Sequence, residues 1–321
     1  MAGSRVAEGR GIERKGSMGK TPLAWAAESG HERVVRELLG RGDIDPDKPG
    51  EDGQTPLCLA AENGHEGVVK MLLGRDDVNP NKPNRGGETP LLRAARDGHE
   101  GIVKMLLQRD DLSPNEPDQY GQTPLWLATY HGHEGIAKLL LERDDVNPNK
   151  VTRGSQTLLW WAVYYGREGV VKTLLQRDDV SPDEPDECRR TPLWWAAGRG
   201  HEGIVKMLLQ RDDVSPDEPD GYSETPLWLA AYHGHEGIVK MLLGRDDISP
   251  DKPNRDGRTP LWWASYRGHE GIVKMLLRRD EVNPDKPDSQ GRAPLLHAAK
   301  NGHAGVVALL QRPTSATHHA A

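Results

Sequence analysis

Histidine is the side chain best suited to proton transfer near neutral pH, and in this sequence it recurs at one fixed spacing. A catalytic acid–base histidine acts once in a site, whereas here the residue stands at eight equivalent positions of a repeating pattern. We therefore interpret these histidines as structural residues, each anchoring a turn between two helices. They are His31, His65, His99, His133, His201, His235, His269 and His303.

Two HxH pairs, His131 with His133 and His233 with His235, have a spacing that could begin a metal site. A zinc site needs at least three protein ligands, and no cysteine or third histidine is spaced to complete either pair. The acidic stretch from Asp212 to Asp220 could gather Ca²⁺, but its prolines stiffen it away from a loop that wraps an ion. We predict no metal and no cofactor.

The elements that position these residues repeat every 34 residues, without an insertion. A fixed period of this length is the signature of a stacked-repeat solenoid. One repeat cannot bury its apolar face alone, so neighbouring repeats must stack. The nine repeats begin at Thr21, Thr55, Thr89, Thr123, Thr157, Thr191, Thr225, Thr259 and Ala293.

Each repeat predicts two short helices and a finger. In repeat six, Thr191 is a good N-cap, the proline behind it suits the first helical position, and Gly200 ends the first helix. A second helix opens at His201 and carries an apolar stripe over residues 204–209, which buries one face. The prolines that follow break regular hydrogen bonding, so residues 211–224 are predicted to form an extended, solvated finger.

The pattern TPLxxAAxxGH, followed by I/V-V-K-x-L-L and then D-V-N/S, resembles the ankyrin repeat from residue 21 to about residue 311. The resemblance implies an all-α fold, an ankyrin-type α-solenoid of nine stacked helix-turn-helix repeats with extended finger loops. Arg-Asp-Asp-Val stands where the family usually has Gly-Ala-Asp-Val, and this RDDVxPDxPD variant is similar to arrays in proteins of filamentous fungi. Tryptophan replaces the usual histidine of TPLH at Trp126, Trp160, Trp194, Trp228 and Trp262.

Three segments are expected along the chain. Residues 1–20 lack periodicity, are rich in glycine and arginine, and are predicted to be a disordered N-terminal segment. Residues 21–312 form the nine ankyrin-like repeats, and residues 313–321 a disordered tail.

Composition argues against several classes of protein. A net charge of −7 and a pI near 6.0 do not fit a nucleic-acid-binding protein. No apolar run is long enough to span a membrane, and no signal peptide is present. Cys58 and Cys188 lie in different repeats without a CxxC partner, which favours a reducing compartment. We therefore expect an intracellular protein, cytoplasmic or nuclear, that binds neither nucleic acid nor membrane.

The resemblance implies that the last two residues of each first helix face a concave groove. In repeats four to eight these residues are mostly aromatic or cationic, and Tyr and Arg are enriched at interface hot spots. We expect the groove to bind an extended polypeptide with basic and apolar residues, because the fingers beside it are acidic. Duplication of one tyrosine is the alternative explanation. The predicted partner-binding residues are Tyr130, His131, Tyr164, Tyr165, Arg199, Tyr232, His233, Tyr266 and Arg267.

These observations favour a non-enzymatic protein–protein interaction module or scaffold whose partner is another protein. One alternative is a structural protein whose near-identical repeats self-associate head to tail into filaments. A second is an enzyme with a pocket at irregular repeat five, where Leu158 replaces proline, Arg167 replaces histidine, and Ser155 and Arg189 replace turn glycines. The repeated tryptophans could pack in the core or form a ligand-stacking platform.

Overall fold

The computed structural model describes residues 19–149 and 156–311, and within them it contains eighteen helices and no strand. The chain divides into two compact units, an N-terminal unit of residues 1–161 and a C-terminal unit of residues 162–321, with the boundary inside α9. Residues 1–18 of the predicted disordered segment 1–20, the whole predicted tail 313–321 and Ser155 lie outside the described residues.

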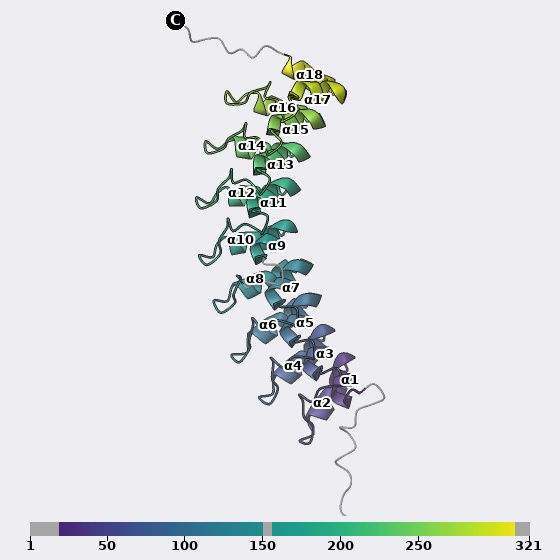
Figure 1. Cartoon of the computed structure of the whole chain (residues 1–321). Coiled ribbons are helices and arrows are strands. Elements are labelled where there is room, and N and C mark those ends of the chain that lie inside the picture. The colour runs from purple at the N-terminus through teal and green to yellow at the C-terminus, as the bar shows by residue number, and fades with distance from the viewer. Residues whose placement is uncertain (1–18, 150–155, 312–321) are drawn as a thin grey trace, which may run out of the picture. The chain divides into compact units, whose positions relative to one another are not determined.

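Two helices form each repeat, and their bounds follow the 34-residue period (Figure 1). The N-terminal unit contains α1 (Pro22–Glu28), α2 (Glu32–Leu39), α3 (Pro56–Glu62), α4 (Glu66–Leu73), α5 (Pro90–Asp97), α6 (Glu100–Leu107), α7 (Pro124–His131), α8 (Glu134–Leu141) and the start of α9 (Leu158–Tyr164). The C-terminal unit continues with α10 (Glu168–Leu174), α11 (Pro192–Arg199), α12 (Glu202–Leu208), α13 (Pro226–His233), α14 (Glu236–Leu243), α15 (Pro260–Arg267), α16 (Glu270–Leu276), α17 (Pro294–Lys300) and α18 (Ala304–Leu310).

Within each unit the first helices pack on one another and the second helices pack on one another. The chain of contacts runs α1–α3–α5–α7 in the N-terminal unit and α11–α13–α15–α17 in the C-terminal unit, with parallel rows α2–α4–α6–α8 and α10–α12–α14–α16–α18. Small residues such as Ala196 and Ala197 are fully buried between first helices, and Ile204 and Val205 between second helices. The predicted all-α solenoid of helix-turn-helix repeats is confirmed.

Six of the recurring histidines bond to the repeat before them, and they are His65, His99, His133, His235, His269 and His303. His65 donates its Nε2–H to the carbonyl oxygen of Glu28 at 2.9 Å, and His99 does the same to Glu62. The ring of His65 lies against Gly30, which follows α1 and takes a φ of +68°. A Cβ on Gly30 would come within 2.7 Å of this ring. The structural interpretation is thus confirmed for these histidines, although the turn they anchor belongs to the preceding repeat.

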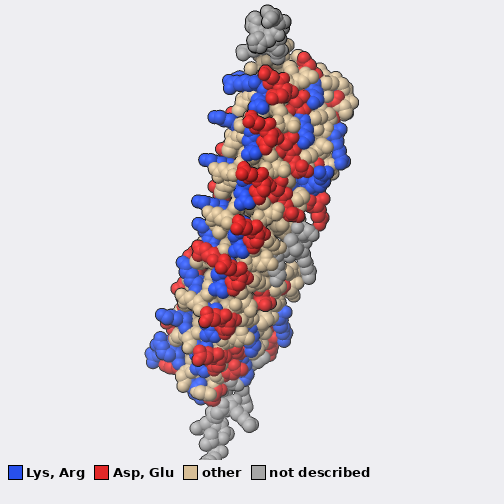
Figure 2. All heavy atoms as spheres, turned by 90° about the vertical axis from the view of Figure 1, so that its left-hand side faces the viewer, with Lys and Arg blue, Asp and Glu red and all other residues tan. Residues whose placement is uncertain are grey.

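An arginine at the base of most fingers performs a similar task. Arg211 pairs with Asp213 at 2.7 Å and donates Nη1–H to the carbonyl oxygen of Leu175, at the end of α10, at 2.8 Å. A helix ends with unsatisfied carbonyls, so this arginine caps the preceding repeat's second helix. On the face shown in Figure 2, the Asp and Glu side chains lie in separate clusters with Lys and Arg side chains beside them. The prediction of a solvated finger is wrong for Val214 and Pro216, which are buried against the array.

One buried carboxylate makes the last finger sensitive to acid. Burial alone would raise the pKa of Asp288, but Arg292 donates Nε–H and Nη2–H to its Oδ2 at 2.9 and 2.7 Å. The backbone N–H groups of Gln290 and Arg292 also donate to Oδ1, and together these bonds lower the pKa of Asp288 to about 2. Because the folded pKa lies below the ordinary 3.8, this stabilisation is present above about pH 4 and is lost as the pH falls toward about 2.

We expect Asp288→Asn to lower the free energy of unfolding at pH 7 by roughly 2 kcal/mol and to flatten its dependence on pH between about 4 and 2. Asn254 holds the equivalent turn through Oδ1, which accepts the N–H groups of Asp256 and Arg258 at 3.0 and 3.1 Å, so the variant can keep the fold. Denaturant titrations of both proteins across this pH range measure the effect. If the free energy of unfolding depended equally on pH in both proteins, the low pKa assigned to Asp288 would be contradicted.

Candidate functional site

The predicted groove residues of the C-terminal unit lie at the ends of its first helices. Positive φ angles occur directly after α11, α13 and α15, at Gly200, Gly234 and Gly268. The two predicted groove residues of each of these repeats are therefore the last two residues of its first helix. Their side chains reach the surface to different degrees. Tyr165, Arg199, His233, Tyr266 and Arg267 are exposed, and Tyr164 and Tyr232 are half-buried.

In the N-terminal unit, Tyr130 and His131 occupy the same repeat position at the end of α7, and both are exposed. The ring of Tyr130 stacks on Trp126 with centroids 4.9 Å apart, and His131 meets the edge of Tyr130 at 5.2 Å. This unit therefore presents one aromatic pair of its own.

A second row of tryptophans supports the tyrosines, and the sequence reasoning missed it. Trp195 and Trp263 are half-buried and lie edge-on to tyrosines of the preceding repeat, at 5.2 Å from Tyr164 and 4.7 Å from Tyr232. The available signal was spacing, because Trp195 stands four residues before Arg199, which puts both on one helix face.

Two guanidinium groups lie over this aromatic surface. The Cζ of Arg199 is 3.5 Å from the ring centroid of Tyr164, and that of Arg267 is 4.3 Å from the centroid of Tyr232, both within the range of cation–π attraction. Neither arginine has a carboxylate within 4.0 Å among the described residues of the chain. Burial, with the nearby His235, Arg267 and His269, lowers the pKa of His233, so His233 is neutral at pH 7.

A cavity of about 580 Å³ opens in this surface, within the range typical of ligand pockets. It forms where the row of tyrosines is interrupted by Gly198. The residues around it carry no carboxylate and no thiol. They are Tyr164, Tyr165, Trp194, Trp195, Gly198, Arg199, His201, Leu229 and His233.

A model of the family of ankyrin repeats, in its three-copy form, matches the sequence at residues 6–84, 25–118, 77–152, 111–186, 159–254 and 246–318. The chain belongs to the ankyrin repeat family. Repeats of this family are generic protein-interaction modules, and the proteins built from them are typically non-enzymatic scaffolds. A search of curated proteins gave no match to the chain.

The tryptophan at the fourth position of the ankyrin repeat belongs to the core. Trp194, Trp228 and Trp262 are buried, and each donates its indole N–H to the backbone carbonyl of the last residue of its own repeat, Glu224, Arg258 or Arg292, at 3.0, 3.1 and 3.3 Å. A buried indole needs such a partner. Core packing, rather than a ligand platform, therefore explains these three residues.

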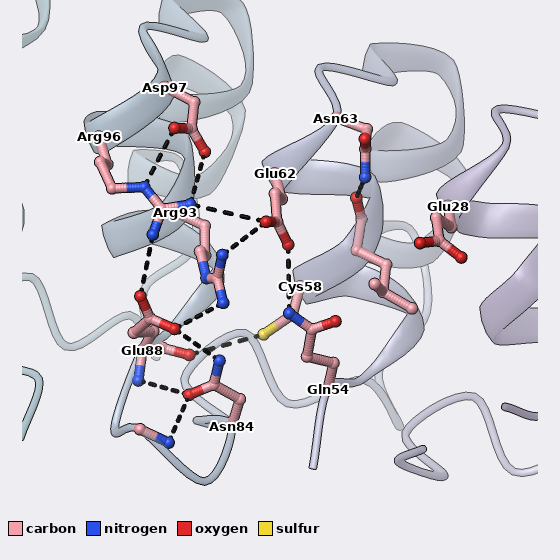
Figure 3. Close-up of polar contacts among 12 residues, drawn as sticks. Glu28, Gln54, Cys58, Glu62, Asn63, Asn84, Glu88, Arg93, Arg96 and Asp97 are labelled. Atoms are coloured by element: carbon pink, nitrogen blue, oxygen red, sulfur yellow. Dashed lines mark hydrogen bonds and ion pairs between the residues drawn. The ribbon is translucent and has the colours of Figure 1, made fainter. Parts of the chain in front are cut away.

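The first ankyrin repeats fill the corresponding surface with paired charges. Arg93, at the position of Trp195, lies between Glu62 and Glu88 at 2.6 Å from each, and Arg96 adds a pair with Glu88 at 3.0 Å (Figure 3). Asp97 in turn holds Arg96 at 3.0 Å. Because these charges already satisfy one another, this part of the N-terminal unit offers no unpaired guanidinium like Arg199.

The remaining chemistry of the ankyrin array is limited. Burial raises the pKa of the Cys58 thiol to about 11, so this cysteine stays protonated and unreactive at neutral pH. The rings of His131 and His133 lie nearly parallel, 6.2 Å apart. Across residues 19–149 and 156–311, no three His, Cys, Asp or Glu side chains gather as a metal ion would require. In the same part of the chain, every helix is too short or too polar to cross a bilayer.

Proposed function

We propose that this ankyrin repeat protein is a scaffold that binds a partner polypeptide on the groove face of repeats five to eight, at Tyr164, Tyr165, Arg199, Tyr232, His233, Tyr266 and Arg267. Tyr130 and His131 of repeat four, in the N-terminal unit, are proposed as partner-binding residues of that unit. The partner is another protein, and the site needs no metal or cofactor.

The observation that carries the proposal is the pair of unpaired guanidiniums on tyrosine rings. Most arginines in the C-terminal unit hold a carboxylate, as Arg211 holds Asp213 at 2.7 Å, whereas Arg199 and Arg267 rest on Tyr164 and Tyr232. Tyr and Trp side chains lose little conformational entropy when they bind, and together with Arg they are enriched at the hot spots of protein interfaces. A surface built from them favours a macromolecular partner over simple solvation.

Photo-cross-linking tests this proposal with a matched pair of positions. Benzoylphenylalanine is placed at Tyr165, beside the cavity, or at Tyr222, which is 58% exposed but lies in a finger. We expect the partner to be captured at Tyr165 and not at Tyr222, and the purified partner then to bind the native chain. Equal capture at both positions, or none at Tyr165, would refute the proposed face. Capture of a second copy of this chain would support the filament alternative instead.

A further inference from the structure

The interruption at Gly198 has no backbone explanation. Three of the five residues at this repeat position in the C-terminal unit are tyrosines, Tyr164, Tyr232 and Tyr266, and the other two are Gly198 and Lys300. Gly198 lies inside α11 and does not take the positive φ that the turn glycine Gly200 requires. Glycine in a helix costs about 1 kcal/mol relative to alanine, so this position gives up stability and leaves a space.

Aromatic and apolar side chains border the space, which is open to solvent. Tyr164 and Trp195 pack edge to face at 5.2 Å, and Leu229 of the next repeat faces Gly198. A Cβ placed on Gly198 would lie 3.3 Å from Leu229 Cδ2, in tight but adjustable contact. The opening therefore corresponds to the place of a missing aromatic side chain, bordered by Leu229 where Tyr164 and Tyr232 instead meet Trp195 and Trp263 of the next repeat.

The charge beside this space is positive. Arg199, the next residue, stacks on Tyr164 and contributes the only full charge at neutral pH among the residues that line the cavity. Asp186 contacts the lining as well, since its Oδ2 accepts the indole N–H of Trp195 at 3.1 Å. A planar guanidinium held on a ring keeps its N–H edge available for a carboxylate.

We propose that the cavity at Gly198 receives an aromatic side chain of the partner polypeptide, while Arg199 binds an aspartate or glutamate next to that aromatic residue. The inference rests on the proposed function and names the class of partner segment: an extended peptide in which an aromatic residue is flanked by acids. Arg267 on Tyr232 offers a second carboxylate contact in the same unit.

This recognition differs from the basic partner that the acidic fingers suggested. Several finger carboxylates are paired within the array, since Asp213 pairs with Arg211 and Asp247 with Arg245, both at 2.7 Å. Asp217 likewise pairs with Lys252 at 3.2 Å. At the cavity, the charge without a partner inside the protein is that of Arg199, and it favours an anionic residue of the bound peptide.

Selection from a phage-displayed library of random dodecapeptides on the full chain tests the inference. We expect enriched peptides to contain Trp, Tyr or Phe next to Asp or Glu. As synthetic peptides they should bind Gly198→Tyr at least about 30-fold more weakly than the native chain, the usual loss for a hot spot. Gly198→Tyr should melt no lower than the native chain, because tyrosine has the higher helix propensity. Arg199→Gln, a change at an exposed side chain, provides a second variant and should cost at least about tenfold in affinity.

The outcomes separate the inference from the proposed function. A fivefold alanine variant at Tyr164, Tyr165, Arg199, Tyr232 and His233 reports on the groove as a whole. Peptides that lose affinity for this variant but bind Gly198→Tyr normally, or that are basic and not acidic, would overturn the inference and leave the groove in place. Failure to enrich any peptide, or enrichment of peptides insensitive to all three variants, would overturn both.

Discussion

Replacing Trp228 with alanine is expected to lower the free energy of unfolding by about 3–5 kcal/mol, the usual cost of truncating a buried aromatic residue. Trp228 is 5% exposed, stacks on Tyr232 at 5.6 Å and meets Trp263 edge-on at 5.4 Å. The substitution opens a void in the seam between repeats seven and eight. It also leaves the carbonyl of Arg258 without the indole N–H that donates to it at 3.1 Å.

The chain offers a matched control for this substitution. Leu92 occupies the same repeat position in the N-terminal unit and is fully buried there, so leucine is compatible with the fold. Trp228→Leu should lose roughly half as much stability as Trp228→Ala, because it keeps most of the apolar contact and lacks the hydrogen bond. Denaturant unfolding followed by circular dichroism measures both. If Trp228→Ala lowered the free energy of unfolding by less than about 1 kcal/mol, the row of buried tryptophans Trp194, Trp228 and Trp262 would not be a packed core.

The fivefold alanine variant of the groove is expected to weaken partner binding by at least about 30-fold, since hot-spot truncations cost 2 kcal/mol or more. All five side chains are at least partly exposed, so helicity should be preserved. The effect is measured by titration calorimetry, at one salt concentration, with the purified partner that photo-cross-linking identifies.

Two controls accompany this prediction. Circular dichroism must first show that the variant is folded. Tyr222→Ala, which removes an exposed tyrosine from a finger, should leave the affinity within about twofold of the native value, as surface positions outside a hot spot do. Native affinity in a folded fivefold variant would restore repeat duplication as the explanation of the tyrosines.

The fold followed from the sequence because its signals are local and are repeated. Each Thr–Pro step predicts a helix start, and Thr225 Oγ1 indeed accepts the N–H of Trp228 at 3.2 Å. Each Gly–His step predicts a turn. The direction of the histidine contact could not be predicted, because the Nε2–H of His269 reaches the carbonyl of Tyr232, a residue of the preceding repeat. Contacts between repeats depend on how they stack, which local spacing does not specify.

The candidate site was predicted in outline only. Position in the repeat identifies the tyrosines and arginines, but it gives no reason to single out Gly198, whose lack of a side chain leaves the space of the cavity. The interpretation of the fingers erred for a similar reason. A run of acids and prolines looks solvated, yet Asp183 is held inward by the N–H of Ser215 in the next repeat at 3.0 Å.

Amide hydrogen exchange of the full chain, free and saturated with its partner polypeptide, tests the central claim most directly. If the partner binds on the groove face, the largest gain in protection should fall in the last turns of α11, α13 and α15. The second helices α12, α14 and α16 should change little. Protection confined to those second helices or to the fingers, with the ends of the first helices unchanged, would contradict the proposed groove.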